Sequence, residues 1–174
     1  GSAAARALEP RIARPGDPSS IPEDRDCYVT QWRLAHGELD RARVAIERLR
    51  GTAAGPGVSP GLALFSKGCA ILLDALLASA EKRADLDDRI ARLDSLMLTG
   101  PPYRGYNQWW NLVVARLKED RGDRQGALAA TRRRLYFQAE PNFLSTYLRE
   151  EGRLAALTGD RAGAIRAYQH YLAL

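Results

Sequence analysis

The chain has 174 residues, enough for one compact domain or one short helical array, and its hydrophobic content of 45% excludes wholesale disorder. The net charge of +5 does not indicate nucleic-acid binding, because 23 of the 26 basic residues are arginines scattered among 21 acids. The only basic run, 132–134, would fan around a helix rather than form one face. We therefore expect no nucleic-acid partner, and the arginine-rich composition is typical of GC-rich coding.

The N-terminal part of the chain predicts a linker followed by a first helical pair. Residues 1–20 are rich in Pro, Gly and Ser and indicate a flexible linker, with Gly1-Ser2 typical of a cleaved expression tag. Pro22 begins a helix that runs to Gly37, with an apolar stripe at Tyr28, Trp32 and Ala35. A second helix spans about 39–50 and is stopped by Gly51.

Three more helical pairs follow. After a loop at 51–61, Ser59 as N-cap and Pro60 at the first helical position begin a long helix to about Ala80. Its partner spans about 84–98, with Leu86, Ile90, Leu93 and Leu96-Met97 facing inward and Asp87-Asp88 and Arg92 facing outward. No strand pattern is found. The sequence predicts an all-α domain over 21–174, with hairpins at about 22–50, 60–98, 106–137 and 141–174.

The turns between paired helices share a pattern. Gly159-Asp160, Gly122-Asp123 and Gly37-Glu38 are each followed by an alanine five residues after the glycine. With Leu148, Gly152, Ala155 and Tyr168, the last pair resembles the tetratricopeptide repeat (TPR). Turns at Gly37, about Ala80, Gly122 and Gly159 give spacings of about 43, 42 and 37 residues, so a HEAT-like repeat is the alternative. Asn111, Lys118 and Thr131 stand where such repeats carry large aromatics.

The TPR resemblance implies a right-handed α-α superhelix whose first helices line a concave, partner-binding groove. It places Trp109, Leu112, Arg116 and Glu119 in the groove from the third pair, and Thr146, Arg149, Arg153 and Ala156 from the fourth. The first pair would add Asp24, Cys27, Gln31 and Leu34. Arginines beside Trp109 suit a carboxylate-bearing or acidic peptide. In the alternative interpretation, Trp109-Trp110 is core and the arginines pair with Glu119, Glu150 and Glu151.

The resemblance also places Cys27 and Cys69 at similar positions of consecutive first helices. They could form a disulfide in an oxidising compartment, or be two small buried hydrophobic residues. For the compartment we expect the cytoplasm, with the periplasm as the alternative.

No pattern for catalysis, metal binding or membrane insertion is found. The sequence has two Cys and two His, without CxxC, HExxH, GxSxG or GxxxxGK[ST]. Its longest apolar run, 69–80, contains Asp74 and is too short to span a bilayer. We expect no enzyme activity, cofactor, metal or membrane insertion.

The sequence thus predicts a non-enzymatic protein-interaction module. Its resemblance to repeat regions of bacterial signalling and regulatory proteins implies the C-terminal repeat region of a larger protein of that kind. Two alternatives stay open. One is a small-molecule sensor with a pocket near Tyr103, Tyr106 and Trp109. The other is a scaffold that forms a homodimer through the C-terminal hairpin. The predicted last helix, 162–174, has no polar outer face, and the end of a solenoid needs a polar cap or a covering partner. A bulky residue at Gly159 or Ala164 should disrupt that hairpin through close helix approach.

Overall fold

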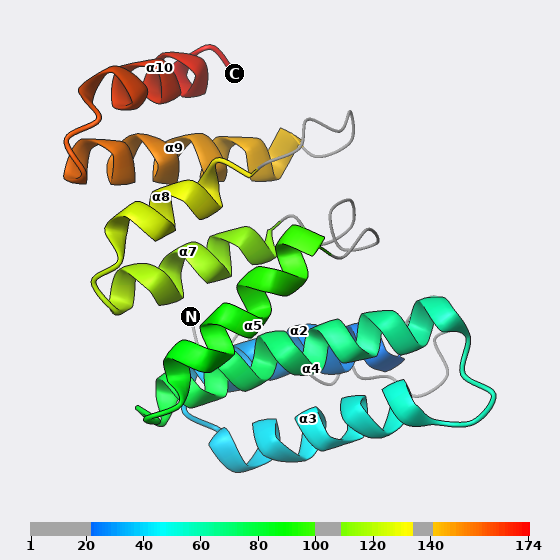
Figure 1. Ribbon diagram of the computed structural model, residues 1–174. Coiled ribbons are helices and arrows are strands. Elements are labelled where there is room, and N and C mark those ends of the chain that lie inside the picture. The colour runs from blue at the N-terminus through cyan, green and yellow to red at the C-terminus, as the bar shows by residue number, and fades with distance from the viewer. Residues whose placement is uncertain (1–21, 100–108, 134–140) are drawn as a thin grey trace. The chain divides into compact units, whose positions relative to one another are not determined.

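The computed structural model describes residues 22–99, 109–133 and 141–174 (Figure 1). Every regular element in these ranges is an α-helix, which confirms the all-α prediction for the part described. The elements are α2 (Pro22–Ala35), α3 (Leu39–Ala54), α4 (Pro60–Ala80), α5 (Leu86–Thr99), α7 (Trp110–Asp120), α8 (Arg124–Thr131), α9 (Pro141–Leu157) and α10 (Arg161–Leu172). The predicted linker at 1–20, and Tyr103 and Tyr106 of the predicted pocket, lie outside the described residues.

The chain divides into two compact units, with the boundary between Arg89 and Ile90 inside α5. Unit 1 contains α2, α3, α4 and the first residues of α5. Unit 2 contains the rest of α5 and α7 to α10. Because the boundary falls within the predicted hairpin at 60–98, one continuous array of four hairpins stays a prediction.

Four turns share one backbone geometry. Each contains a residue with positive φ, namely Gly37 (76°), Lys82 (53°), Gly122 (84°) and Gly159 (81°). In all four, the amide of that residue donates to the carbonyl three residues earlier, and the next amide donates to the carbonyl five residues earlier. These bonds satisfy the last carbonyls of the helix, as in the Schellman motif. The second turn lies at Lys82, whereas the sequence predicted it at about Ala80. The prediction was inexact because this turn contains no glycine that would mark its position.

The first residues after two of these turns also repeat. The carboxylates of Asp123 and Asp160 accept hydrogen bonds from the backbone amides of Gly126 and Gly163, at 2.8 and 2.9 Å. A Cβ on either glycine would lie within 2.3 Å of the capping carboxylate, so these caps need glycine at the third helical position. In the repeated sequence Gly-Asp-Arg-x-Gly-Ala, the first glycine therefore forms the turn and the aspartate caps the helix that follows.

Three predictions about the extent or the buried side of single helices differ from the structure. In α2 the buried residues are Cys27, Thr30 and Leu34, so the apolar stripe predicted at Tyr28, Trp32 and Ala35 is wrong. The residues of α2 that are buried are those that face α3 and α4, not those with the largest side chains. Helix α3 continues through Gly51 to Ala54, since one helical glycine costs only about 1 kcal/mol and two alanines follow it.

The third difference is the end of α8, which was predicted at about Phe137. The helix ends at Thr131, whose hydroxyl donates to the carbonyl of Leu128, 2.8 Å away. The amide of Arg132 then caps the helix on the carbonyls of Leu128 and Ala130. A side-chain hydroxyl that bonds the preceding turn weakens helix propagation at this point.

Helix α4 forms the core of unit 1. It packs against α2 and α3, begins at Pro60 with Ser59 as its N-cap as predicted, and buries residues along most of its length. By length and composition alone it could cross a membrane, but half of that stretch is buried inside the protein. Its one acidic side chain, Asp74, is held by ion pairs with Arg50 (3.2 Å) and Arg89. This environment favours a core helix.

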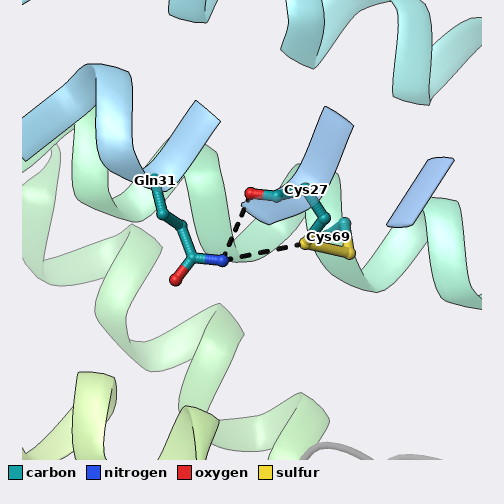
Figure 2. The surroundings of a disulfide bond; sticks show 3 residues. All are labelled: Cys27, Gln31 and Cys69. Atoms are coloured by element: carbon teal, nitrogen blue, oxygen red, sulfur yellow. Dashed lines mark hydrogen bonds between the residues drawn. A yellow bond between two sulfur atoms is a disulfide. The ribbon is translucent and has the colours of Figure 1, made fainter. Parts of the chain in front are cut away.

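A disulfide joins α2 to α4 (Figure 2). Cys27 and Cys69 have Cα atoms 5.7 Å apart, and both residues are buried. The side-chain amide of Gln31 lies over the bridge and donates to the carbonyl of Cys27 at 3.2 Å. Of the two predicted alternatives for Cys27 and Cys69, the structure shows the disulfide. The bridge closes a loop that contains all of α3.

In unit 2, α7 packs on α8, α8 on α9, and α9 on α10 (Figure 1). Small residues lie between the helices: Ala127 and Ala130 in α8, Ala155 in α9, and Ala164 and Ala167 in α10 are buried. A Cβ on Gly152 would lie 2.8 Å from the ring of Tyr168, so this glycine provides the close approach of α9 and α10. Gly159 has no atom within 4 Å of such a Cβ. Its role is conformational, and the crowding predicted there is wrong.

Alanine at Gly37, Gly122 or Gly159 should lower the free energy of unfolding by about 1 kcal/mol each, because positive φ is unfavourable for residues with a Cβ. A Cβ at these positions meets no neighbour, so the effect isolates the backbone. Lys82→Gly should stabilise by about 0.5 kcal/mol. Chemical denaturation measures all four changes. Lys67→Gly, at an exposed position inside α4, is the control and should destabilise by about 1 kcal/mol. Destabilisation by Lys82→Gly of the same size would contradict the shared turn.

Replacing Cys27 and Cys69 by alanine should lower the free energy of unfolding of unit 1 by about 4 kcal/mol, from the entropy of the loop that the bridge closes. Denaturant titration measures the loss. A reductant should shift wild type to a similar midpoint and leave the double variant unchanged. Free thiols in the denatured, unreduced protein would contradict the bridge.

Candidate functional site

The six residues predicted to bind a partner all lie in unit 2. Trp109 immediately precedes α7, Leu112, Arg116 and Glu119 follow at helical spacing along it, and Arg149 and Arg153 lie on α9. We call the surface formed by these six residues the α7/α9 face. Trp109 and Leu112 are partly exposed, and the ring of Trp109 meets the ring of Trp110 edge-on at a centroid distance of 6.0 Å. Trp110 is fully buried, so the two tryptophans divide between surface and core.

A forked ion pair links the two helices of this face. The guanidinium of Arg153 donates through Nη1 to Oε1 of Glu119 at 2.7 Å and through Nη2 to Oε2 at 2.6 Å. Its Nε donates to Oε2 of Glu150 at 2.9 Å. Bidentate pairing of this kind fixes geometry as well as charge. It raises the pKa of Arg153 and lowers the pKa of Glu119 below its usual range.

Arg116 and Arg149, each about one turn before the paired residue of its own helix, are held much less tightly. The side chain of Arg116 is 81% exposed and its nearest carboxylate, Asp120, is 4.0 Å away. The side chain of Arg149 is 60% exposed and lies 3.7 Å from Glu150. Exposed pairs at these distances contribute little to stability. Two guanidinium groups on neighbouring helices therefore remain available to a carboxylate from outside.

The structure thus divides the predicted arginines into two kinds. Arg153 pairs with Glu119 and Glu150, as the alternative interpretation expected, whereas Arg116 and Arg149 remain open. Of the other predicted groove positions, Thr146 is partly exposed and Ala156 is exposed on α9. In unit 1, Cys27 and Leu34 are buried core residues and Gln31 covers the disulfide.

Two further charged clusters in unit 2 were not predicted as clusters. Asp94 of α5 accepts from Lys118 of α7 at 2.5 Å and from Arg133. Burial alone would raise the pKa of Asp94, but the hydrogen bonds and charges of Arg133 and Lys118 lower it. In the second cluster, Arg132 pairs with Glu151 at 3.1 Å and with Asp160 at 2.5 Å.

The basic run supplies both clusters. Arg132 and Arg133 point to different acids, in keeping with the expected fan of consecutive arginines, and Arg134 lies outside the described residues. The sequence signals were the run itself and the repeated Gly-Asp turn. Neither signal identifies the acid in another helix that each arginine meets.

Within the described ranges, no group of three or more His, Cys, Asp or Glu side chains is arranged to hold a metal ion. The chain matches no protein-family model, no curated protein and no solved structure.

Glu119→Gln should lower the free energy of unfolding by up to about 1 kcal/mol at neutral pH, since the pair is partly exposed and screened. The hydrogen bonds from Arg153 hold the folded-state pKa of Glu119 below the usual value for a glutamate, so the contribution is present above that usual value and is lost as pH falls through the folded pKa. Denaturation of wild type and variant at several pH values should show their difference vanishing in acid. Asp120→Asn, next along the helix, is the control and should differ little from wild type at any pH. A difference that grew in acid would contradict the pairing.

Proposed function

We propose that this chain is a non-enzymatic helical-repeat module that binds an acidic segment of a partner protein on the α7/α9 face. The observation that carries the proposal is the pair of open guanidinium groups, Arg116 and Arg149, on two helices that the Arg153–Glu119 fork ties together. A planar guanidinium binds a carboxylate with two parallel hydrogen bonds, so two of them in a fixed frame suit a segment with spaced Asp or Glu residues.

The fork is what makes the frame suitable for binding. Arg153 is already satisfied by Glu119 and Glu150, so it holds α7 against α9 and contributes little free charge. Because the helices are already linked, a ligand that pairs with Arg116 and Arg149 has little of the protein to order. Partly exposed Trp109 and Leu112 add apolar contact area on the same face.

The repeat character is part of the proposal. It is supported by the four turns of one geometry and by the packing of successive helices in unit 2. A right-handed superhelix of the TPR kind is the arrangement that we propose for the whole chain.

The test is selection of displayed peptides on wild-type protein, followed by affinity measurement on an Arg116→Glu/Arg149→Glu variant. We expect enrichment of Asp- and Glu-rich peptides, and a loss of affinity of at least about tenfold in the variant. Arg153 is left intact so that the fork persists. The control, Arg41→Glu/Arg166→Glu, reverses the same amount of charge at exposed positions of α3 and α10 and should keep the affinity. Peptides without acidic residues, or equal losses in both variants, would exclude this surface.

A further inference from the structure

The last helix exposes a row of apolar side chains. In α10, Ile165 is 49% exposed, Tyr168 38% and Leu172 81%, and their spacing places them along one side of the helix. Ala164 and Ala167 are buried against α9, and the partly exposed ring of Tyr168 also lies against α9, next to Gly152. Arg161 lies at the N-terminal end of the same row. We call Arg161, Ile165, Tyr168 and Leu172 the α10 row.

Comparison with α8 shows what this row is suited to contact. The two helices follow the same Gly-Asp turn, so positions can be compared by distance from Gly122 and Gly159. The alanines five and eight residues after the glycine are buried in both helices. The residues six and nine after it, Leu128 and Thr131, are buried in α8. Their counterparts in α10 are Ile165 and Tyr168, which are exposed.

The difference has a visible cause. Helix α8 packs on α9 as well as on α7, and the ion pair of Arg132 with Glu151 shows that this side of α8 faces α9. Within the part of the chain that the structure describes, α10 packs mainly on α9, and Arg132 adds an ion pair to Asp160 at its N-cap. The α10 row therefore presents the surface that, one hairpin earlier, receives another helix.

The charges of α10 indicate which helix can occupy this surface. Its N-terminal turn carries Arg161, whereas its C-terminal turn has no acidic or basic side chain except His170 and ends in the carbonyls of the helix terminus. A helix C-terminus carries partial negative charge, which attracts a cation. Two copies of α10 packed antiparallel would place Arg161 of each beside the C-terminal turn of the other, so the helix is complementary to itself.

The apolar residues agree with this pairing. With Ile165 of one copy opposite Tyr168 of the other, Arg161 lies opposite Leu172, and all four layers of the antiparallel pair are filled. The methylene groups of Arg161 can cover Leu172 while the guanidinium reaches the helix end. Both copies use the same surface, so the assembly closes as a symmetric dimer.

We propose that the chain forms a homodimer through antiparallel contact of the α10 row with the α10 row of a second copy. The surface is separate from the α7/α9 face, so the dimer and the proposed peptide binding can each be present without the other.

Sedimentation equilibrium of the full chain over a roughly hundredfold concentration range tests the dimer. Wild type should associate, and Ile165→Lys should weaken the association at least about tenfold by placing a charge in the contact. Val44→Lys is the control, because Val44 is 60% exposed on α3 and lies outside the row. A strictly monomeric wild type would overturn the proposal, and the row would then be left for a different partner.

A charge reversal distinguishes the pairing from general stickiness and from misfolding. Arg161→Glu should weaken the dimer, since it places an anion beside the partner's negative helix end, although an acid at this position favours α10 itself. Arg166→Glu, at an exposed position outside the row, should leave association unchanged. Circular dichroism checks that all variants keep their helices. A dimer unaffected by both Ile165→Lys and Arg161→Glu would use another surface and would refute the antiparallel contact.

Discussion

The left-handed residue at the end of a helix is the constraint on which the hairpins depend. A residue at positive φ lets the next two amides bond back to the last turn, so the chain reverses without losing its terminal carbonyls. The same geometry holds at Gly37, Gly122 and Gly159, and also at Lys82, where the side chain makes it unfavourable. In three of the four turns, a buried alanine five residues later lets the second helix approach the first. Turn and close packing therefore act together.

Further interactions hold neighbouring helices together, and the two units differ in that only unit 1 contains a disulfide among the described residues. Unit 1 has a covalent link, the buried bridge of Cys27 and Cys69 between α2 and α4, in addition to ion pairs between its helices such as Arg50 with Asp74. Disulfides persist in oxidising compartments, so we expect this bridge to be intact only in such surroundings. In unit 2 the fixing is ionic: Arg153 joins α7 to α9, and Arg132 joins the end of α8 to α9 and to the cap of α10.

The sequence predicted what is local and missed what depends on distant contacts. Ser59 and Pro60 mark the start of α4, and the glycine turns with their alanines mark three hairpins, because each signal lies within a few residues. The turn at Lys82 lacks a glycine and was misplaced by two residues. The buried side of α2 could not be read from side-chain size, because a disulfide partner in α4 determines it. Glu119 and Arg153 were both predicted at the site, and only the alternative interpretation expected them to pair. Their pairing, 34 residues apart, makes one predicted ligand a structural element.

This last point bears on how a charged surface can bind at all. An arginine that fills its hydrogen bonds within the protein must lose them before it can meet a ligand, so it gains little from binding. An arginine in water with a distant carboxylate loses only hydration and a weak pair. Arg153 is of the first kind, while Arg116 and Arg149 are of the second. The satisfied group links the two helices that carry the open ones. Rigidity and free charge are thus carried by different residues of one face, and that separation is what a preorganised binding surface requires.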